Sequence, residues 1–386
     1  SRLNAQARRS ASIMRGLATG YARTRNSQPW NHDKVTSADS HAWRRAADAV
    51  LTHYALDVTG ITHITQGLVN LTLKLATRDG QQYALQRLHP VFGPGVNHNI
   101  ETVCAHLAAR GLLTPQLVRT RDEALAVEHE GARWRVMTWI DGRAFDFLAT
   151  PAQAKAAGAL LARFHSALVD FPHALRAERP PVHDYARHRG RLDAALHAAA
   201  GHRLHTEVEA ATAHIDTLRK AHAAPLVTAP RLVHGDPKIS NLLFDANGVE
   251  ALCLVDLDTL AHMALPLELG DALRSWCNPR REDDPLARFE LPLFSAAVGG
   301  YGAAARALVS AAEVAAIVPA TLEIHLELAV RFLVDALEEN YFGWDASRYE
   351  SRGAHNLARA LGQLAAARSL VAQWSAAQDA VARAFA

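Results

Sequence analysis

The sequence predicts an α+β fold with two lobes, a small antiparallel β-sheet followed by a largely helical region. Three β-rich runs separated by short loops indicate an antiparallel meander, at 61–65, 71–77 and 83–88. Ala-rich amphipathic segments predict helices in the second half, at about 191–222, 290–312, 321–339 and 354–384. Between these two regions, residues 232–259 form a polar motif that carries the candidate chemistry.

The composition is that of a globular protein large enough for more than one packed unit. The chain has 386 residues, and 49% of them are hydrophobic, which supports a large core. Its 41 Lys and Arg nearly balance its 39 Asp and Glu, so nucleic acid is not an expected partner. The three cysteines lie far apart, and no apolar run is long enough to span a membrane. We therefore expect a cytoplasmic protein with no membrane contact.

Residues 1–36 are expected to be a flexible Arg-rich extension. They contain six arginines and no acidic residue before Asp33. Such a segment can be a transit peptide, but it has no clear apolar face, and an extension without that role is the preferred interpretation. Two lobes are expected after it, an N-lobe at 37–138 and a helical C-lobe at 139–386.

The N-lobe begins with a helix and continues into the meander. The loop between the first two strands contains Gly67 and ends at Asn70. A glycine in such a loop allows backbone amides to lie over nucleotide phosphates, although an ordinary hairpin turn explains the glycine equally well. Gly67 and Asn70 are therefore candidate nucleotide-binding residues.

The third strand should supply a cation for the α and β phosphates of a nucleotide. Where a Lys would end the strand tetrad of a kinase, this chain has Gln86, and Arg87 follows it. Arg87 could supply the charge if the strand register or a bulge turns it inward, with Glu101 on the helix at 97–110 as its partner. Both could equally be surface residues.

Residues 134–140 form a dense apolar strand that ends at Asp141. In a two-lobed kinase this segment would be the hinge that binds adenine through its backbone, so Met137 and Trp139 are candidate nucleotide contacts. A buried strand without that role is the alternative. Thr150 and Pro151 then provide an N-cap and a first turn for a helix that reaches about Leu168.

The motif at 232–259 is predicted to be a catalytic loop followed by a hairpin. Apolar runs at 242–244 and 249–255 flank Asp245-Ala246-Asn247-Gly248, and an Asn-Gly pair between such runs is a strong hairpin signal. Folding at this turn returns Asp256 to the neighbourhood of Asn241.

These side chains have the types and the spacing that phosphoryl transfer to a hydroxyl requires. An Asp accepts the proton of the acceptor, while an Asn five residues later and a separate Asp hold Mg²⁺. Asp236, Asn241 and Asp256 fit these roles. Lys238 could neutralise charge on the transferred group, and His234 could fix the loop by hydrogen bonding. An ordinary turn beside a strand is the alternative, but the four matches and the hairpin outweigh it.

With these motifs, the chain resembles the aminoglycoside phosphotransferase and choline kinase group, which has the protein-kinase-like two-lobed fold. The resemblance covers about residues 60–370. Within the group the chain is most similar to the N-acetylhexosamine 1-kinases, which use Leu-Gln-Arg where other kinases have Lys. The motifs that carry this similarity lie at 67–72, 85–87, 183–184, 234–241, 255–259, 270–274, 331–333, 341–342 and 355–357.

The resemblance implies that Asp271, Arg274, Arg331 and Tyr341 contact the acceptor. Arg331 and Tyr341 are separated by about three helical turns, which fits a sugar-binding wall or a buried Arg beside a core aromatic. The stretch between these two residues is one residue shorter than in the sugar kinases, and Leu68 replaces a polar residue. The acceptor can therefore differ from theirs.

The sequence predicts an ATP- and Mg²⁺-dependent kinase that transfers the γ-phosphoryl group to a hydroxyl of a small molecule. The resemblance implies a sugar acceptor such as an N-acetylhexosamine, phosphorylated at its anomeric position. An aminoglycoside, choline or another amino alcohol is the alternative acceptor, although acidic residues do not cluster in the later motifs. Gln86 suggests a non-catalytic nucleotide-binding pseudokinase as an alternative of another class, and a metal-dependent phosphoesterase is a third.

Overall fold

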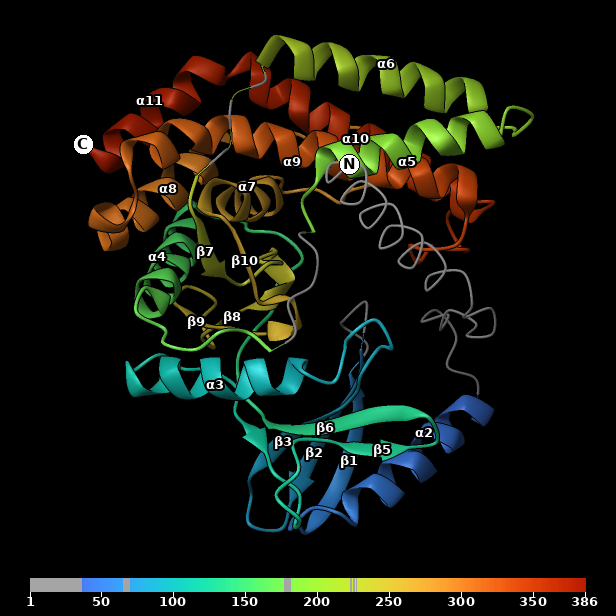
Figure 1. Cartoon of the computed structure of the whole chain (residues 1–386), viewed down its shortest axis with the longest axis vertical. Coiled ribbons are helices and arrows are strands. Elements are labelled where there is room, and N and C mark those ends of the chain that lie inside the picture. Colours follow the sequence, from blue (N-terminus) through green and yellow to red (C-terminus); the bar gives the residue numbers. More distant parts are fainter. Residues whose placement is uncertain (1–36, 65–69, 177–181, 223, 225, 227) are drawn as a thin grey trace, which may run out of the picture. The chain divides into compact units, whose positions relative to one another are not determined.

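The computed structural model describes residues 37–386 apart from 65–69, 177–181, 223, 225 and 227 (Figure 1). The chain divides into a unit at Ser1–Lys34 and a compact unit at Val35–Ala386. The extension predicted at 1–36 therefore lies outside the described residues, and the fold presented below is that of the second unit. The predicted border between lobes at residue 138 stays a prediction.

The predicted meander is confirmed as part of a larger sheet. Strands β1, β2 and β3 pair in sequence as antiparallel neighbours, and β6 pairs with the other edge of β3. The elements of this region are α2 (Ser37–Leu51), β1 (Val58–Ile64), β2 (Leu71–Thr77), β3 (Gln82–Arg87), α3 (Val96–Ala109), β4 (Leu117–Val118), β5 (Val127–His129) and β6 (Ala132–Thr138). Both β4 and β5 pair with β6.

The two faces of this sheet have different surroundings. Successive side chains of a strand point to opposite faces. Leu85 on β3 and Val136 on β6 join a buried cluster with Ala47 of α2, so this face is the one that α2 covers. Gln86 and Arg135, which lie opposite each other on the same two strands, are hydrogen-bonded to each other on the other face. That second face is the one that meets the catalytic hairpin.

The helical region surrounds one large apolar core. That core also includes residues of α3 such as Ile100. The longest helix of this region is α9, which packs against α5, α6, α7, α10 and α11. The helices are α4 (Pro151–Leu168), α5 (Tyr185–Ala198), α6 (His205–His222), α7 (Leu265–Trp276), α8 (Leu291–Ala305), α9 (Ala311–Glu338), α10 (Arg352–Ala372) and α11 (Trp374–Phe385). None of the helices in the described part of the chain has the length and apolar character to cross a membrane.

Helix existence was predicted better than helix boundaries. The segment predicted at 191–222 is two helices, α5 and α6, and the segment predicted at 354–384 is also two, α10 and α11. Helix α9 begins about ten residues earlier than expected, because Ser310 and Glu313 form a capping box at its start and Pro319 is accommodated inside it. The predicted cap at Thr150 is confirmed, with Gln153 completing the box.

The predicted hairpin is confirmed at the centre of the second region. Strands β8 (Leu242–Phe244) and β9 (Ala251–Leu254) are antiparallel partners, and Leu242 lies opposite Leu254. A second pair, β7 (Pro230–Val233) and β10 (Ala261–Ala264), holds the segments that enter and leave this hairpin. The catalytic loop therefore starts at the end of β7.

Candidate active site

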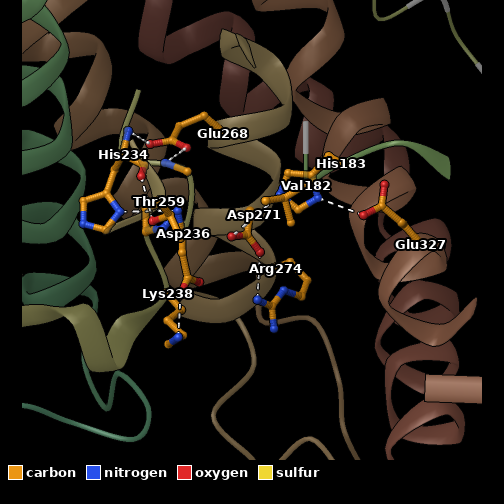
Figure 2. A network of polar contacts seen from close by, with 12 residues as sticks. Val182, His183, His234, Asp236, Lys238, Thr259, Glu268, Asp271, Arg274 and Glu327 are labelled. Carbon is orange, nitrogen blue, oxygen red and sulfur yellow. Dashed lines mark hydrogen bonds and ion pairs between the residues drawn. The ribbon is translucent and has the colours of Figure 1, made fainter. Parts of the chain in front are cut away.

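The backbone of the catalytic loop is fixed by a carboxylate that lies behind it. Glu268, at the start of α7, is fully buried and accepts hydrogen bonds from the backbone nitrogens of His234 and Gly235, each at 3.0 Å (Figure 2). The Nε2 atom of His234 lies 2.9 Å from the carbonyl oxygen of Val255, and Thr259 Oγ1 donates to the carbonyl of His234. The loop and the segment after β9 are thus held together.

Gly235 is required by this close approach. Its φ of +84° is in the left-handed region, and a Cβ atom there would lie 2.1 Å from the carbonyl oxygen of Thr259. Any other residue would push the two segments apart.

Asp236 is the centre of the polar group that the sequence predicted. Lys238 Nζ lies 2.5 Å from Asp236 Oδ2, and Asn241 Nδ2 lies 3.2 Å from the same oxygen and 2.8 Å from the carbonyl oxygen of Asp236. Burial lowers the pKa of Lys238, but the negative charges of Asp236 and Asp256 outweigh this effect, so its pKa is raised. Lys238 therefore stays charged beside the candidate base.

Asp256 returns to this group through the hairpin. The backbone nitrogen of Val255 donates to the carbonyl of Asn241 at 2.9 Å, and Asp256 itself has a φ of 64°. Burial, followed by repulsion from Asp258, raises the pKa of Asp256 to about 7. A cation would relieve both effects, because it favours the charged carboxylate.

The donor set at Asn241 and Asp256 suits a hard cation. Mg²⁺ prefers oxygen ligands and is usually bound through one or two carboxylates together with phosphates. In the described part of the chain, no group of three or more His, Cys, Asp or Glu side chains could hold a metal alone. Asn241 and Asp256 therefore fit a cation that nucleotide phosphates would also bind.

Arg87 does not lie on the inner face of the sheet, where a phosphate-binding cation was expected. The pairing of β3 with β2 and β6 is regular, so Arg87 shares the face of Leu85, which α2 covers. No bulge turns Arg87 inward, and Glu101 forms its ion pair with Arg119. The cation beside Gln86 is Arg135 on β6, which donates to Gln86 Oε1 at 2.9 and 2.7 Å.

Of the other candidate nucleotide contacts, Asn70, Met137 and Trp139 lie around this inner face. Gly67 lies outside the described residues. Asn70 is bonded to Asp258, with Nδ2 and Oδ2 2.7 Å apart. Met137 is buried at the end of β6. Trp139 follows β6, and the ammonium group of Lys74 lies 4.5 Å from the centre of its ring.

A second polar group continues from α7 toward α9. Asp271 pairs with Arg274 at 2.8 Å, and Arg274 also reaches Glu282 at 2.9 Å. His183 Nδ1 lies 3.0 Å from Glu327 Oε1, while its Nε2 lies 4.0 Å from Asp271 Oδ2 (Figure 2). Burial lowers the pKa of His183, but Glu327 and Asp271 outweigh burial, so its pKa is raised.

Arg331 and Tyr341 lie at the end of this group. Arg331 is on α9, and its guanidinium lies 5.8 Å from the ring centre of Phe342, which also contacts Tyr341 edge to face. Tyr341 is 62% exposed, so it is no core aromatic. The turn that presents it is held by buried Asp335, whose carboxylate accepts hydrogen bonds from the backbone nitrogens of residues 340–342.

The comparison with known families decides the class of the protein. The model of the phosphotransferase enzyme family matches residues 60–313, which is more than half of the chain. The chain belongs to the phosphotransferase enzyme family. It is therefore an enzyme of the phosphotransferase class, and the hairpin motif lies inside the matched region.

Solved structures show the same fold as this phosphotransferase. An aminoglycoside phosphotransferase from Alicyclobacillus acidocaldarius is 18% identical, with a TM-score of 0.56, over 92% of this chain and 99% of its own. The amicoumacin kinase hAmiN, solved with AMP-PNP and Ca²⁺, is 16% identical, with a TM-score of 0.58, over 86% and 96%. A microcompartment-associated aminopropanol kinase is 18% identical, with a TM-score of 0.58, over 88% and 99%. The predicted protein-kinase-like fold is confirmed.

Three residues that organise the site of this phosphotransferase were missed in the sequence. Glu268 holds the catalytic loop, Asp335 holds the turn at Tyr341, and Arg135 occupies the inner face of the sheet. Only Arg135 left a usable signal, because it interrupts an otherwise apolar strand at 134–140. Glu268 and Asp335 lie in helices where an acidic residue is unremarkable.

Proposed function

We propose that this phosphotransferase transfers the γ-phosphoryl group of ATP to a hydroxyl of a small molecule, with Asp236 as the general base. The observation that carries the proposal is the position of Asp236, whose Oδ2 atom is held by both Lys238 and Asn241. A base fixed in this way is oriented before the acceptor arrives, which is where most of its catalytic effect originates.

Asn241 and Asp256 would hold Mg²⁺ in this proposal. When bound with the nucleotide, the ion neutralises charge on the phosphates. The amide nitrogen of Asn241 is turned toward Asp236, so its oxygen remains available as a ligand. Lys238 stays charged and lies between the two carboxylates, where it can offset the charge of the transferred group.

The nucleotide would lie between the inner face of the sheet and the hairpin. Met137, near the end of β6, and Trp139, just after it, would form the hinge, and the complex of hAmiN with AMP-PNP supports a nucleotide in this fold. Asn70 and Gln86 both face this region, but their side chains bond to Asp258 and Arg135. They would shape the nucleotide site without binding phosphate themselves.

We propose that the acceptor is a neutral sugar of the N-acetylhexosamine type. The acidic groups that lie toward α9 have cationic partners, since Asp271 pairs with Arg274 and Glu327 with His183. An ammonium group would find little uncompensated negative charge there. His183 Nε2 and Arg274 Nε are buried without a hydrogen-bond partner among the described residues, and both can donate to hydroxyl or carbonyl oxygens.

The exposed ring of Tyr341 adds a surface for a sugar. Sugar sites combine a few well-placed polar groups with an apolar or aromatic face. Tyr341 follows α9 in a turn fixed by Asp335, and the guanidinium of Arg331 lies 5.8 Å from the ring centre of the neighbouring Phe342. These side chains would bind the acceptor, whereas Asp271 and Arg274 would connect that binding to the catalytic loop.

Acceptor-dependent formation of ADP from ATP tests both parts of the proposal. The panel should contain N-acetylhexosamines, neutral hexoses, aminoglycosides, choline and short amino alcohols, each with and without Mg²⁺. Activity with hexosamines and not with amino alcohols is the expected result. Activity confined to amino alcohols would overturn the proposed sugar acceptor but would leave the assignment of Asp236 as the base intact. Nucleotide binding without ADP formation on any acceptor would favour the non-catalytic function that Gln86 suggests.

A further inference from the structure

Arg135 is buried and fully hydrogen-bonded. Its side chain is 1% exposed, and it lies on β6 opposite Gln86. It donates twice to Gln86 Oε1, once to Asn97 of α3 and twice to the carboxylate of Asp258. A guanidinium has five N–H groups, so none remains for a phosphate oxygen. Arg135 therefore differs in its contacts from the strand Lys of other kinases, although it lies beside the position of that Lys.

Asp258 connects Arg135 to the segment that carries Asp256. Its carboxylate accepts bonds of 2.6 and 2.9 Å from Arg135, and one of 2.7 Å from Asn70. Asn70 in turn accepts a bond from the backbone nitrogen of residue 89. Asp258 lies two residues after Asp256, within the 3₁₀ turn Leu257–Thr259. Three segments distant in sequence thus meet at one carboxylate, namely those of Asn70, Arg135 and Asp258 itself.

We propose that Arg135 is a positioning residue for the nucleotide site, which acts by holding Asp258 and, through the turn Leu257–Thr259, the backbone of Asp256. The proposal rests on the assignment of Asp256 as a metal ligand. Asp256 has a left-handed backbone, which costs energy for a residue other than glycine and persists only where the surroundings impose it. The Arg135–Asp258 pair provides such surroundings from the sheet.

A purely stabilising role predicts a different behaviour of variants. Replacing both members of a buried ion pair by apolar residues is often neutral for stability, whereas removing one member leaves a buried charge and is strongly destabilising. The double variant Arg135→Met with Asp258→Leu therefore separates the two roles. It should lose less stability than Arg135→Met alone, which leaves the buried carboxylate of Asp258 without its cation, and it still lacks the bidentate contact that fixes the turn.

The matched control is the ion pair of Arg133 and Glu128, in which Arg133 lies two residues before Arg135 on β6 and Glu128 lies opposite it on β5. Their ion pair is 2.7 Å long, and Glu128 is largely exposed. The double variant Arg133→Met with Glu128→Leu removes the same chemical groups without touching Asp258. It should leave nucleotide binding and melting temperature unchanged.

Two measurements test the proposal. Calorimetry with Mg²⁺ and AMP-PNP should show binding at least about tenfold weaker in the Arg135→Met, Asp258→Leu variant, as expected when a ligand must impose the order that the protein no longer provides. Hydrogen exchange of the nucleotide-free and metal-free protein should be faster at residues 255–260. Wild-type affinity together with wild-type exchange would overturn the proposal.

A third variant keeps the test decisive if the double variant does not fold. Arg135→Lys retains the charge but offers three N–H groups on one ammonium where the guanidinium offers five in a fixed fork, so it cannot keep all five hydrogen bonds. We expect several-fold weaker binding of Mg²⁺ and AMP-PNP, and wild-type affinity would overturn the proposal. Asp256→Ala distinguishes the underlying assignment, because unchanged binding in that variant would refute the metal site while the exchange result for Arg135 would stand on its own.

Discussion

The catalytic hairpin and the inner face of the sheet differ in how their contacts run along the chain. In the catalytic loop that leads into the hairpin, Asp236, Lys238 and Asn241 lie within five residues of one another, and Asp236 contacts both of the others. On the sheet, Gln86 and Arg135 are 49 residues apart, and Arg135 and Asp258 are 123 apart. Contacts between residues close in sequence can be recognised from their spacing, whereas contacts between distant residues depend on strand register. The hairpin could therefore be predicted from the sequence, whereas the contacts of Arg135 could not.

The largest effect should come from the hairpin. Asp236→Asn keeps the shape of the side chain and removes the base, so turnover should fall by a factor on the order of 10² or more. Binding of AMP-PNP and the melting temperature should stay nearly unchanged, because Asp236 is partly exposed and no core contact is lost. Steady-state ADP release and calorimetry check this, with exposed Asp122→Asn as the control. Wild-type turnover would refute the base assignment.

Much of the fold could be predicted from the sequence, and the errors have physical causes. The meander, the hairpin and the cap at Thr150 follow from local patterns, and all three are confirmed. The register of β3 against β6 does not follow from either strand alone. The sequence left open whether Arg87 turns inward or lies at the surface, and strand alternation places it on the face of Leu85.

The acceptor side should give the next largest effect. If Arg331 donates to a sugar oxygen, Arg331→Ala should weaken use of the acceptor by roughly 1.5 to 3 kcal/mol, as for a hydrogen bond from a charged group. The Michaelis constant for ATP and the melting temperature should remain close to wild type. Kinetics against acceptor concentration test this, with exposed Arg306→Ala as the control. A large fall in melting temperature with normal acceptor kinetics would make Arg331 structural.

A smaller effect should appear in the pH dependence of stability. Burial and repulsion from Asp258 raise the pKa of Asp256 to about 7 in the folded protein. A raised carboxyl pKa means that the folded state binds the proton more tightly. The contribution of Asp256 to the free energy of unfolding is therefore most favourable below about pH 4, and this stabilisation is lost as the pH rises through about 7.

Asp256→Asn should remove this dependence. Without metal and nucleotide, its melting temperature should exceed that of the wild type increasingly between about pH 5 and about pH 8. The difference between the two proteins is the quantity to measure, because other carboxylates titrate in both and cancel. A difference in melting temperature that does not change with pH would show that the pKa of Asp256 is not raised in the folded protein.

The smallest effect should come from Arg87, and it bears most directly on the comparison between hairpin and sheet. The regular pairing of β3 places Arg87 on the face covered by α2, away from Gln86 and Arg135. Arg87→Ala should therefore change the Michaelis constant for ATP by no more than about twofold, as is usual for a side chain that does not contact the ligand. Gln86→Ala should raise that constant more, because it removes the acceptor of two Arg135 hydrogen bonds. A larger increase for Arg87→Ala than for Gln86→Ala would mean that Arg87 reaches the phosphates when the nucleotide binds. The sheet would then supply its cation from β3 after all, and Arg135 would support the site without replacing that charge.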